Sequence, residues 1–141
     1  MRSSYLACVT STRAAVVRAV PLDKDRVLLT RKPGRDRLLE VGLSGWIEDG
    51  ETSWQAAVRE TREEIGAQVI RLQDIGEYYV AERDLLIACF IVILSGPIIH
   101  LNRNELHTAR WVRPADAFAL HQVDPQHRAI LEALRRRPRQ R

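Results

Sequence analysis

Residues 45–67 read GWIEDGETSWQAAVRETREEIGA, and this stretch decides how the rest of the chain is interpreted. Thr52 followed three residues later by Gln55 matches a capping box, in which each side chain accepts a hydrogen bond from the other residue's backbone N–H at the start of a helix. Gly66 stands where a helix commonly ends on a left-handed residue. The stretch therefore predicts a helix between Thr52 and Gly66.

Three carboxylates share one face of this predicted helix. Glu60, Glu63 and Glu64 are spaced i, i+3 and i+4, so their side chains are neighbours on the helix surface. The residues expected to pack on a sheet cluster on the other side and are Trp54, Ala57, Val58, Thr61 and Ile65. We therefore expect one face of the helix to dock on the sheet and the other to present the three carboxylates.

Clustered carboxylates repel one another, by a few tenths of a kcal/mol for each solvated i, i+4 pair. A divalent cation removes that repulsion, and Mg²⁺ prefers carboxylate oxygens together with substrate phosphates and water. The alternative is a solvated helix face on which Arg59 and Arg62 balance the charge. Taken alone, the three carboxylates fit the solvated face better, and a longer pattern reverses that preference.

The longer pattern resembles the Nudix box, Gly-x5-Glu-x7-Arg-Glu-U-x-Glu-Glu-x-Gly-U, where U is a bulky aliphatic residue. All seven fixed positions match, as Gly45, Glu51, Arg59, Glu60, Glu63, Glu64 and Gly66. Seven matches at set spacing have a chance probability on the order of 10⁻⁸ to 10⁻⁹ per start position. Thr61 and Ala67 depart from the bulky aliphatic type, and Leu43-Ser44-Gly45 stands where many members have Pro-Gly-Gly.

The resemblance implies a metal site. Glu60 and Glu64 would be the main metal ligands, and Glu63 would help directly or through water. Arg59 would orient the carboxylates, by pairing with Glu51. The implied ion is Mg²⁺, for which Mn²⁺ can substitute.

Residues outside the helix complete the expected site. Residues 105–112 look like the family's late loop, so Glu105 is a candidate fourth metal ligand or general base. The general base could instead be Glu60 or Glu64. Glu105 itself could instead be a plain carboxylate on a surface loop. Backbone groups at Gly45 and Trp46 would lie near the metal and the substrate phosphates. The Trp46 ring either stacks on a base or packs, and packing is favoured because a tryptophan buries a large area.

The implied activity is a Mg²⁺-dependent hydrolase that cleaves a phosphoanhydride bond in a nucleoside diphosphate linked to another moiety. The alternative is a catalytically silent Nudix-fold module that binds nucleotide or regulates, against which the intact carboxylates argue. A third reading is an isomerase of the isopentenyl diphosphate type. It needs a catalytic cysteine in a polar site, and both Cys8 and Cys89 look wrongly placed.

The remaining segments fit an α/β (α+β) fold, a Nudix-type α/β/α sandwich with a mixed sheet between helices. Strand-like segments and a final helix around Asp124–Arg137 alternate along a single domain, residues 1–141. The expected strands are 14–20, 26–31, 70–80, 85–94 and 110–112, with a turn at 21–25 and an extended stretch at 38–48. Cys89 is expected in the core, and of Tyr78 and Tyr79 one should face inward and one outward.

Charge and hydropathy limit the expected partners. The formal net charge is +4, and a basic tail at about 135–141 supplies five arginines. Without interleaved aromatic residues this tail fits a solvated terminus better than a nucleic-acid platform. The longest apolar run, 85–94, is about half of a membrane span, and no signal peptide is recognised, so we expect a cytoplasmic protein. We expect a small-molecule nucleotide substrate, and a homodimer is possible at the family level.

Several basic residues follow the second predicted strand. Arg31, Lys32, Arg35 and Arg37 either form a solvated loop, which the sequence favours, or meet phosphates. The histidines His100, His107, His121 and His127 show no ligand spacing, so none is assigned a role.

Overall fold

A computed structural model describes residues 13–34, 36–98 and 100–137. The elements run along the chain as β1 (Val16–Asp23), β2 (Arg26–Arg31), β3 (Glu40–Val41), β4 (Leu43–Trp46), α2 (Ser53–Ile65), β5 (Val69–Val80), the 3₁₀ turn η1 (Ala81–Arg83), β6 (Leu85–Leu94), β7 (Thr108–Val112), α3 (Pro114–Phe118), the 3₁₀ turn η2 (Pro125–His127) and α4 (Arg128–Arg135). The expectations for Cys8, Arg35 and the last two tail arginines fall outside the described residues.

The sheet is mixed, as the sequence predicted, and β1 lies at its centre. One edge of β1 pairs in parallel with β6, while the other pairs antiparallel with β4 and then with β2. Beyond this core, β5 pairs with β6, and both β3 and β7 pair with β2. Gly42 connects β3 to β4 and has a φ of +75. A Cβ at this position would lie 2.2 Å from the Ala19 carbonyl oxygen, so only glycine fits.

The first hairpin is confirmed with a tighter turn than expected. β1 continues through Pro21 to Asp23, so only Lys24 and Asp25 make the turn. Lys24 takes a left-handed conformation with φ 56, as tight hairpin turns require. Pro21 is tolerated inside the strand although it lacks a backbone donor, and its neighbours Val20 and Leu22 are buried.

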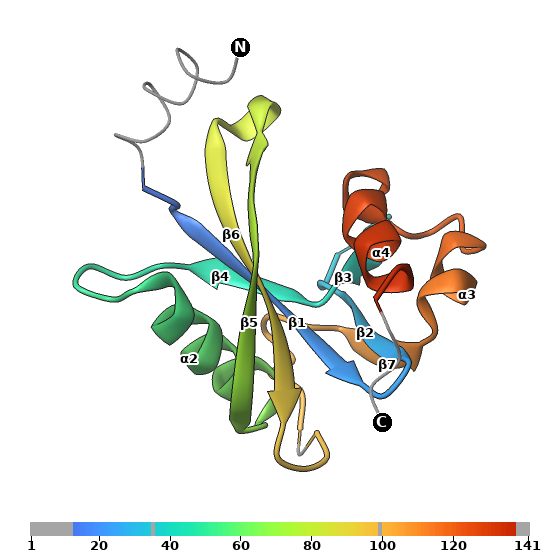
Figure 1. Cartoon of the computed structure of the whole chain (residues 1–141), viewed down its shortest axis with the longest axis horizontal. Coiled ribbons are helices and arrows are strands. Elements are labelled where there is room, and N and C mark those ends of the chain that lie inside the picture. The colour runs from blue at the N-terminus through green and yellow to red at the C-terminus, as the bar shows by residue number, and fades with distance from the viewer. Residues whose placement is uncertain (1–12, 35, 99, 138–141) are drawn as a thin grey trace.

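Two helical layers cover the sheet, one on each face (Figure 1). Strand alternation divides the core between them: Val17 and Ala19 pack in the cluster that contains α2, and Val20 and Leu22 pack in the cluster that contains α4. Cys89 is buried in the α4 cluster, as predicted. The arrangement is an α/β/α sandwich, which confirms the fold class.

The C-terminal layer differs from the sequence prediction. The single helix expected at Asp124–Arg137 is a 3₁₀ turn followed by α4, and α3 was not predicted. Asp124 caps the start of the 3₁₀ turn by accepting from the Gln126 N–H at 3.0 Å. His127, buried at the junction, accepts a 3.0 Å hydrogen bond at Nδ1 from the Val41 N–H and ties this layer to β3.

A buried arginine lies on the same side of the sheet. Arg18 donates to the Tyr78 hydroxyl, the Val41 carbonyl and the Glu40 carboxylate, each at 3.0 Å. Burial alone lowers the pKa of the Arg18 guanidinium, but Tyr78 and Glu40 outweigh that effect and the pKa is raised. Arg18 therefore stays charged inside the fold, where it joins β1 to β3 and β5.

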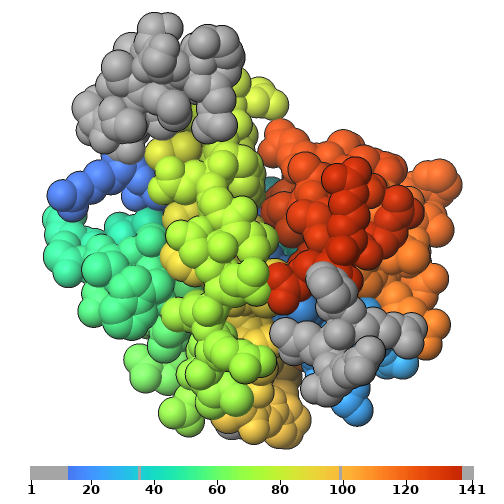
Figure 2. Space-filling view, viewed as in Figure 1, coloured from blue at the N-terminus to red at the C-terminus, as the bar shows by residue number. Residues whose placement is uncertain are grey.

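The far edge of the sheet is open to the surface. Figure 2 shows β5 exposed between the α3–α4 layer and the part of the chain that leads into α2. Tyr78 is half-buried while Tyr79 is 47% exposed and bonded to Asp84, so the two tyrosines face in and out as expected. Among the described residues, no helix is long and apolar enough to cross a membrane.

Candidate metal centre

Helix α2 begins and ends where the sequence predicted. Thr52 Oγ1 accepts from the Gln55 N–H at 3.1 Å, and Gln55 Oε1 accepts from the Thr52 N–H at 2.9 Å. Gly66 closes the helix with φ 67 and donates its N–H to the Arg62 carbonyl oxygen. The two caps fix the start and the length of the helix, and thereby the positions of its carboxylates.

The expected division of α2 into an apolar and a carboxylate face is confirmed for Ala57, Thr61 and Ile65, which are buried, and is wrong for two of the carboxylates and for Trp54. Glu60 and Glu64 are buried at 7% and 1% exposure, beside Ala57 and Thr61, whereas Trp54 is 51% exposed. Positions 57, 60, 61 and 64 follow the i, i+3, i+4, i+7 pattern of a buried stripe. Two of the carboxylates thus belong to the face that packs on β1 and β4.

Two carboxylates of this stripe meet a third from another segment. One oxygen each of Glu60, Glu64 and Glu105 lies within 4.8 Å of the others. Glu60 and Glu64 come from α2, and the exposed Glu105 comes from the loop before β7. Glu63 lies outside this group, because its half-exposed side chain bonds to Arg59 at 3.1 Å.

Gly45 makes room for the buried carboxylate of Glu60. A Cβ at this position of β4 would lie 2.0 Å from Glu60 Oε2 and 2.1 Å from its Cδ. No side chain fits at that separation, so only glycine lets the carboxyl group rest against the strand backbone. Gly45 was expected near the metal and the substrate phosphates, and its contact with Glu60 gives it a place beside a candidate metal ligand.

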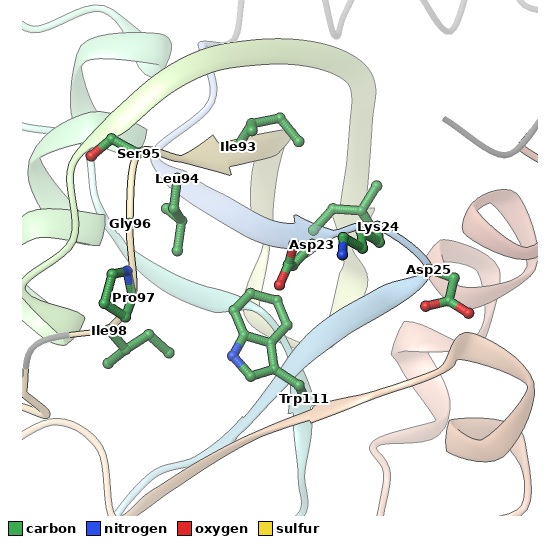
Figure 3. A pocket seen from close by; sticks show the side chains of 11 residues that line it. Asp23, Lys24, Asp25, Ile93, Leu94, Ser95, Gly96, Pro97, Ile98 and Trp111 are labelled. Carbon is green, nitrogen blue, oxygen red and sulfur yellow. The ribbon is translucent and has the colours of Figure 1, made fainter. Parts of the chain in front are cut away.

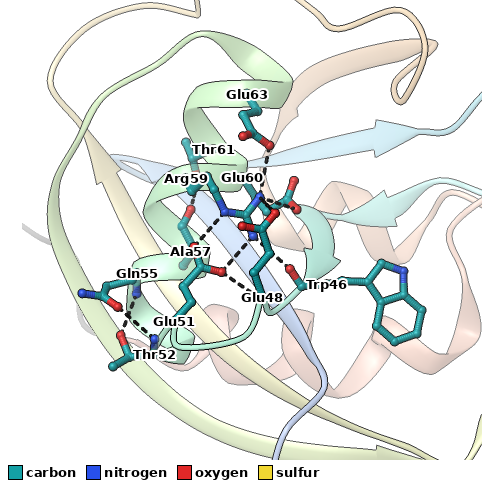
Figure 4. Close-up of polar contacts among 10 residues, drawn as sticks. All are labelled: Trp46, Glu48, Glu51, Thr52, Gln55, Ala57, Arg59, Glu60, Thr61 and Glu63. Atoms are coloured by element: carbon teal, nitrogen blue, oxygen red, sulfur yellow. Dashed lines mark hydrogen bonds and ion pairs between the residues drawn. The ribbon is translucent and has the colours of Figure 1, made fainter.

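Arg59 holds the surrounding acidic side chains in place, as Figure 4 shows. Its Nε and Nη2 donate to the two oxygens of Glu51 at 2.7 and 2.9 Å, which is the pairing expected from the sequence. Its Nη1 donates to Glu60 Oε2 and to Glu63 Oε1, both at 3.1 Å. A two-pronged contact to a carboxylate fixes the guanidinium plane, so Arg59 positions Glu60 from the side.

Burial and proximity alter the acidity of the cluster. The pKa of Glu64 is raised to about 9, mainly because the carboxyl group is buried. A hydrogen bond and charge repulsion from Glu60, and the charge of Glu105, raise it further. Burial is also the main cause that raises the pKa of Glu60. By contrast, the hydrogen bonds from Arg59 lower the pKa of Glu51 to about 2. In the absence of a cation, the Glu60–Glu64 pair therefore retains a proton at neutral pH.

One oxygen of the cluster lacks a partner. Glu64 Oε2 is buried and has no hydrogen-bond partner among the described residues. An unsatisfied buried polar atom costs about 1–3 kcal/mol, so its place is explained if a ligand binds there. Three carboxylates with a free buried oxygen suit a hard divalent cation that prefers oxygen ligands, such as Mg²⁺. The residues present therefore fit the cation.

Trp46 does not pack as the sequence analysis favoured. Its ring is 58% exposed and points away from Arg59, although its carbonyl accepts from Arg59 Nη2 at 2.9 Å. Because the residue occupies the last position of β4, its side chain projects outward while its backbone stays in the network. The indole face is open to a planar ligand.

Two basic residues have positions that the sequence did not predict. Lys32, treated there as part of a basic loop, donates to Ser44 Oγ at 3.4 Å, and its charge opposes the rise in the pKa of Glu64. Arg110 lies in a basic pocket described below. No local pattern marks either residue, because their positions depend on how β2 pairs with β7 and on where the chain passes β4.

A larger cavity lies away from the carboxylates. It measures about 880 Å³ and opens between the β1–β2 turn, the end of β6 and β7. Figure 3 shows Trp111, Leu94 and Ile98 around it, with Asp23 and Lys24 on another side. None of the clustered carboxylates lines it, so its size does not make it the reaction site.

Comparison with known proteins agrees with this geometry. The family model of the NUDIX domain matches residues 12–134 of this chain. An NAD-capped RNA hydrolase, NudC of Pseudomonas aeruginosa, is 34% identical over 88 residues, which cover 62% of this chain and 31% of that protein. The human mitochondrial NAD(P)H pyrophosphatase NUDT13 is 32% identical over 96 residues, covering 63% and 26%. The match thus spans about a third or less of these curated relatives.

Solved structures agree as well. A NUDIX family hydrolase from Clostridium perfringens superposes with a TM-score of 0.71 at 18% identity, over 88% of this chain and 97% of that chain. At that identity the likeness concerns the fold alone. The fold and the carboxylate cluster define the class of α/β/α domains with acidic residues on a helix that packs against the mixed sheet. The chain belongs to the Nudix family.

Proposed function

We propose that the protein is a Mg²⁺-dependent pyrophosphohydrolase that cleaves the phosphoanhydride bond of a nucleoside diphosphate linked to another moiety. The proposal is carried by the free buried oxygen of Glu64 within the Glu60–Glu64–Glu105 cluster. A helix face that served only packing would have no reason to bury two carboxylates side by side. Mn²⁺ is expected to replace Mg²⁺, since it accepts the same oxygen ligands.

The residues would divide the work as follows. Glu60, Glu64 and Glu105 would hold the cation, which when bound neutralises charge on the diphosphate and polarises its phosphorus–oxygen bonds. Arg59 would keep Glu60 in position through the contacts described above. A water molecule attacks one phosphorus, the bridging oxygen leaves with the other phosphate, and a carboxylate accepts the proton of the water. Glu105, exposed on its loop, is the first candidate for that acceptor.

The names of the relatives guide the choice of substrates. They are hydrolases of NAD-capped RNA and of NAD(P)H, molecules in which a diphosphate joins two nucleosides. We therefore propose dinucleotides of this type as the first substrates to test. The exposed ring of Trp46, whose backbone carbonyl accepts from Arg59, supports this choice, because an indole stacks on planar nucleoside rings.

The test is hydrolysis across a substrate panel, with Mg²⁺ and with EDTA. The panel contains NADH, NAD-capped RNA, ADP-ribose, dinucleoside polyphosphates, nucleotide sugars, coenzyme A and deoxynucleoside triphosphates. We expect turnover of one class that depends on Mg²⁺, with ¹⁸O from labelled water in one phosphate product. A protein that binds Mg²⁺ and nucleotide yet hydrolyses none of the panel would instead be a silent binding module.

A further inference from the structure

A second pocket, distinct from the carboxylate cluster, is rich in arginine. It has a volume of about 330 Å³ and is lined by Arg31, Arg37, Leu39, Thr108, Arg110 and Gln122. Arg31 ends β2, and Arg110 lies on β7, two residues along from Thr108, the partner of Arg31. On paired strands, side chains at these positions point to the same face, so the two guanidinium groups are brought to one side.

The guanidinium groups of this pocket are not neutralised within the described part of the chain. Arg31, Arg37 and Arg110 take part in none of its ion pairs, whereas Arg59 and Arg113 do, and no acidic side chain lines the pocket. Three like charges around one small volume repel one another and create a locally positive potential. The arrangement is explained if an anion occupies the pocket.

The pocket adjoins the candidate metal centre through the chain. The Arg31 carbonyl accepts a 2.6 Å hydrogen bond from the His107 N–H, two residues after Glu105. Lys32, the residue after Arg31, donates to Ser44 Oγ at 3.4 Å, next to Gly45, which contacts Glu60. The two segments that carry the pocket therefore also border the carboxylate cluster. A substrate that is bound at the cluster and extends along these two segments would bring a second anionic group to the pocket.

We infer that this pocket binds a phosphate group of the substrate that is additional to the diphosphate being cleaved. The inference rests on the proposed function. Guanidinium groups match phosphate oxygens with two parallel hydrogen bonds, which favours phosphate over a smaller or monodentate anion. Such a group can be a phosphomonoester on a ribose or a phosphodiester of an attached nucleotide, and both present the same oxygens.

The first test measures binding in EDTA and so does not require hydrolysis. Tripolyphosphate is titrated into the wild-type protein and into Arg37→Gln, Arg110→Gln and the double variant by calorimetry. We expect the dissociation constant to rise about tenfold for each single variant, the effect of losing a charge-assisted hydrogen bond. Arg83→Gln, at an exposed position outside the pocket, is the control and should leave binding unchanged. Equal binding by all variants would overturn the inference.

The second test identifies the source of the phosphate, again in EDTA. NADP⁺ is compared with NAD⁺, which lacks one phosphomonoester, and an NAD-capped trinucleotide is compared with NAD⁺, which lacks the phosphodiesters. We expect one of the two larger ligands to bind about tenfold more tightly than NAD⁺ to wild type, and this advantage to vanish in the double variant. An advantage that persists in the double variant, or none in either pair, contradicts the inference. Because turnover is not measured, absence of hydrolysis in the panel would not affect this outcome.

Discussion

Glu64 combines deep burial, a neighbouring carboxylate and an oxygen without a partner among the described residues. We expect Glu64→Gln to lower kcat at least about 100-fold, because a cation ligand contributes several kcal/mol of transition-state stabilisation. Its thermal midpoint in EDTA should not fall, since the amide removes a buried ionisable group. Steady-state kinetics with saturating Mg²⁺ and a melting curve check both points.

Glu63→Gln is the matched comparison for Glu64. Its side chain is 53% exposed and lies outside the cluster, so we expect a loss of less than about tenfold in kcat, mainly through the lost contact to Arg59. An equal loss in the two variants would show that Glu63 binds the cation directly. In that case the cluster described here would be the wrong ligand set.

Gly45 is needed for space beside Glu60. In Gly45→Ala the new methyl group would lie 2.0 Å from Glu60 Oε2, so the carboxylate must move. We expect kcat/KM to fall at least about tenfold, because a displaced ligand misplaces the reacting groups. Gly96→Ala is the control, since a Cβ there meets no atom of the described residues within 4 Å. A Gly45→Ala enzyme with the wild-type kcat/KM would contradict the assignment of Glu60 as a ligand.

Helix α2 depends on its capping box for a defined start. Thr52→Ala removes the side chain that accepts from the Gln55 N–H, and we expect a loss of about 1 kcal/mol in the free energy of unfolding. Urea denaturation monitored by circular dichroism measures it. Ser53→Ala, one residue along, makes no such contact among the described residues and should change stability by less than half as much. Equal losses would mean that the cap contributes nothing.

The same helix shows which parts of an element its sequence predicts. Its ends were predicted because Thr52, Gln55 and Gly66 act through their own backbone neighbours. The burial of its carboxylates was not predicted, because carboxylates are expected to face away from a sheet. Glu60 and Glu64 are buried instead, and Glu60 contacts a glycine on β4. A distant glycine cannot be paired with a helix position from one sequence.

Across the whole molecule, the layers could be predicted but the contacts between distant segments could not. Alternation along β1 separates Val17 from Val20 and so produces the two cores. The burial of Arg18 depends on Glu40 and Tyr78, which lie 22 and 60 residues away in the chain. The arginine pocket likewise depends on the register between β2 and β7. Such pairings follow from the assembled sheet, since no local pattern encodes them.

His127 links the C-terminal layer to the sheet and makes the stability of the molecule depend on pH. Burial, and then the charges of Arg18 and Lys32, lower its pKa from 6.5 to about 3. Between these two values the unfolded chain takes up a proton that the folded protein excludes. Stability from this residue is therefore complete above about pH 6.5 and is lost as the pH falls toward 3, by at most about 1.4 kcal/mol per pH unit.

The prediction is tested by the difference between wild type and His127→Gln, because other groups titrate in the same range. The raised pKa of Glu64 acts in the opposite direction, stabilising the metal-free protein as the pH falls. We expect the variant to be less stable than wild type at pH 7, since the Val41 N–H loses a well-placed acceptor, and this gap to shrink as the pH falls from 6.5 to 4.5. His121→Gln, at an exposed position, should keep the wild-type profile. A gap that stays constant between pH 7 and 4.5 would mean that His127 takes up its proton without unfolding, and that the C-terminal layer can move away from β3 to admit it.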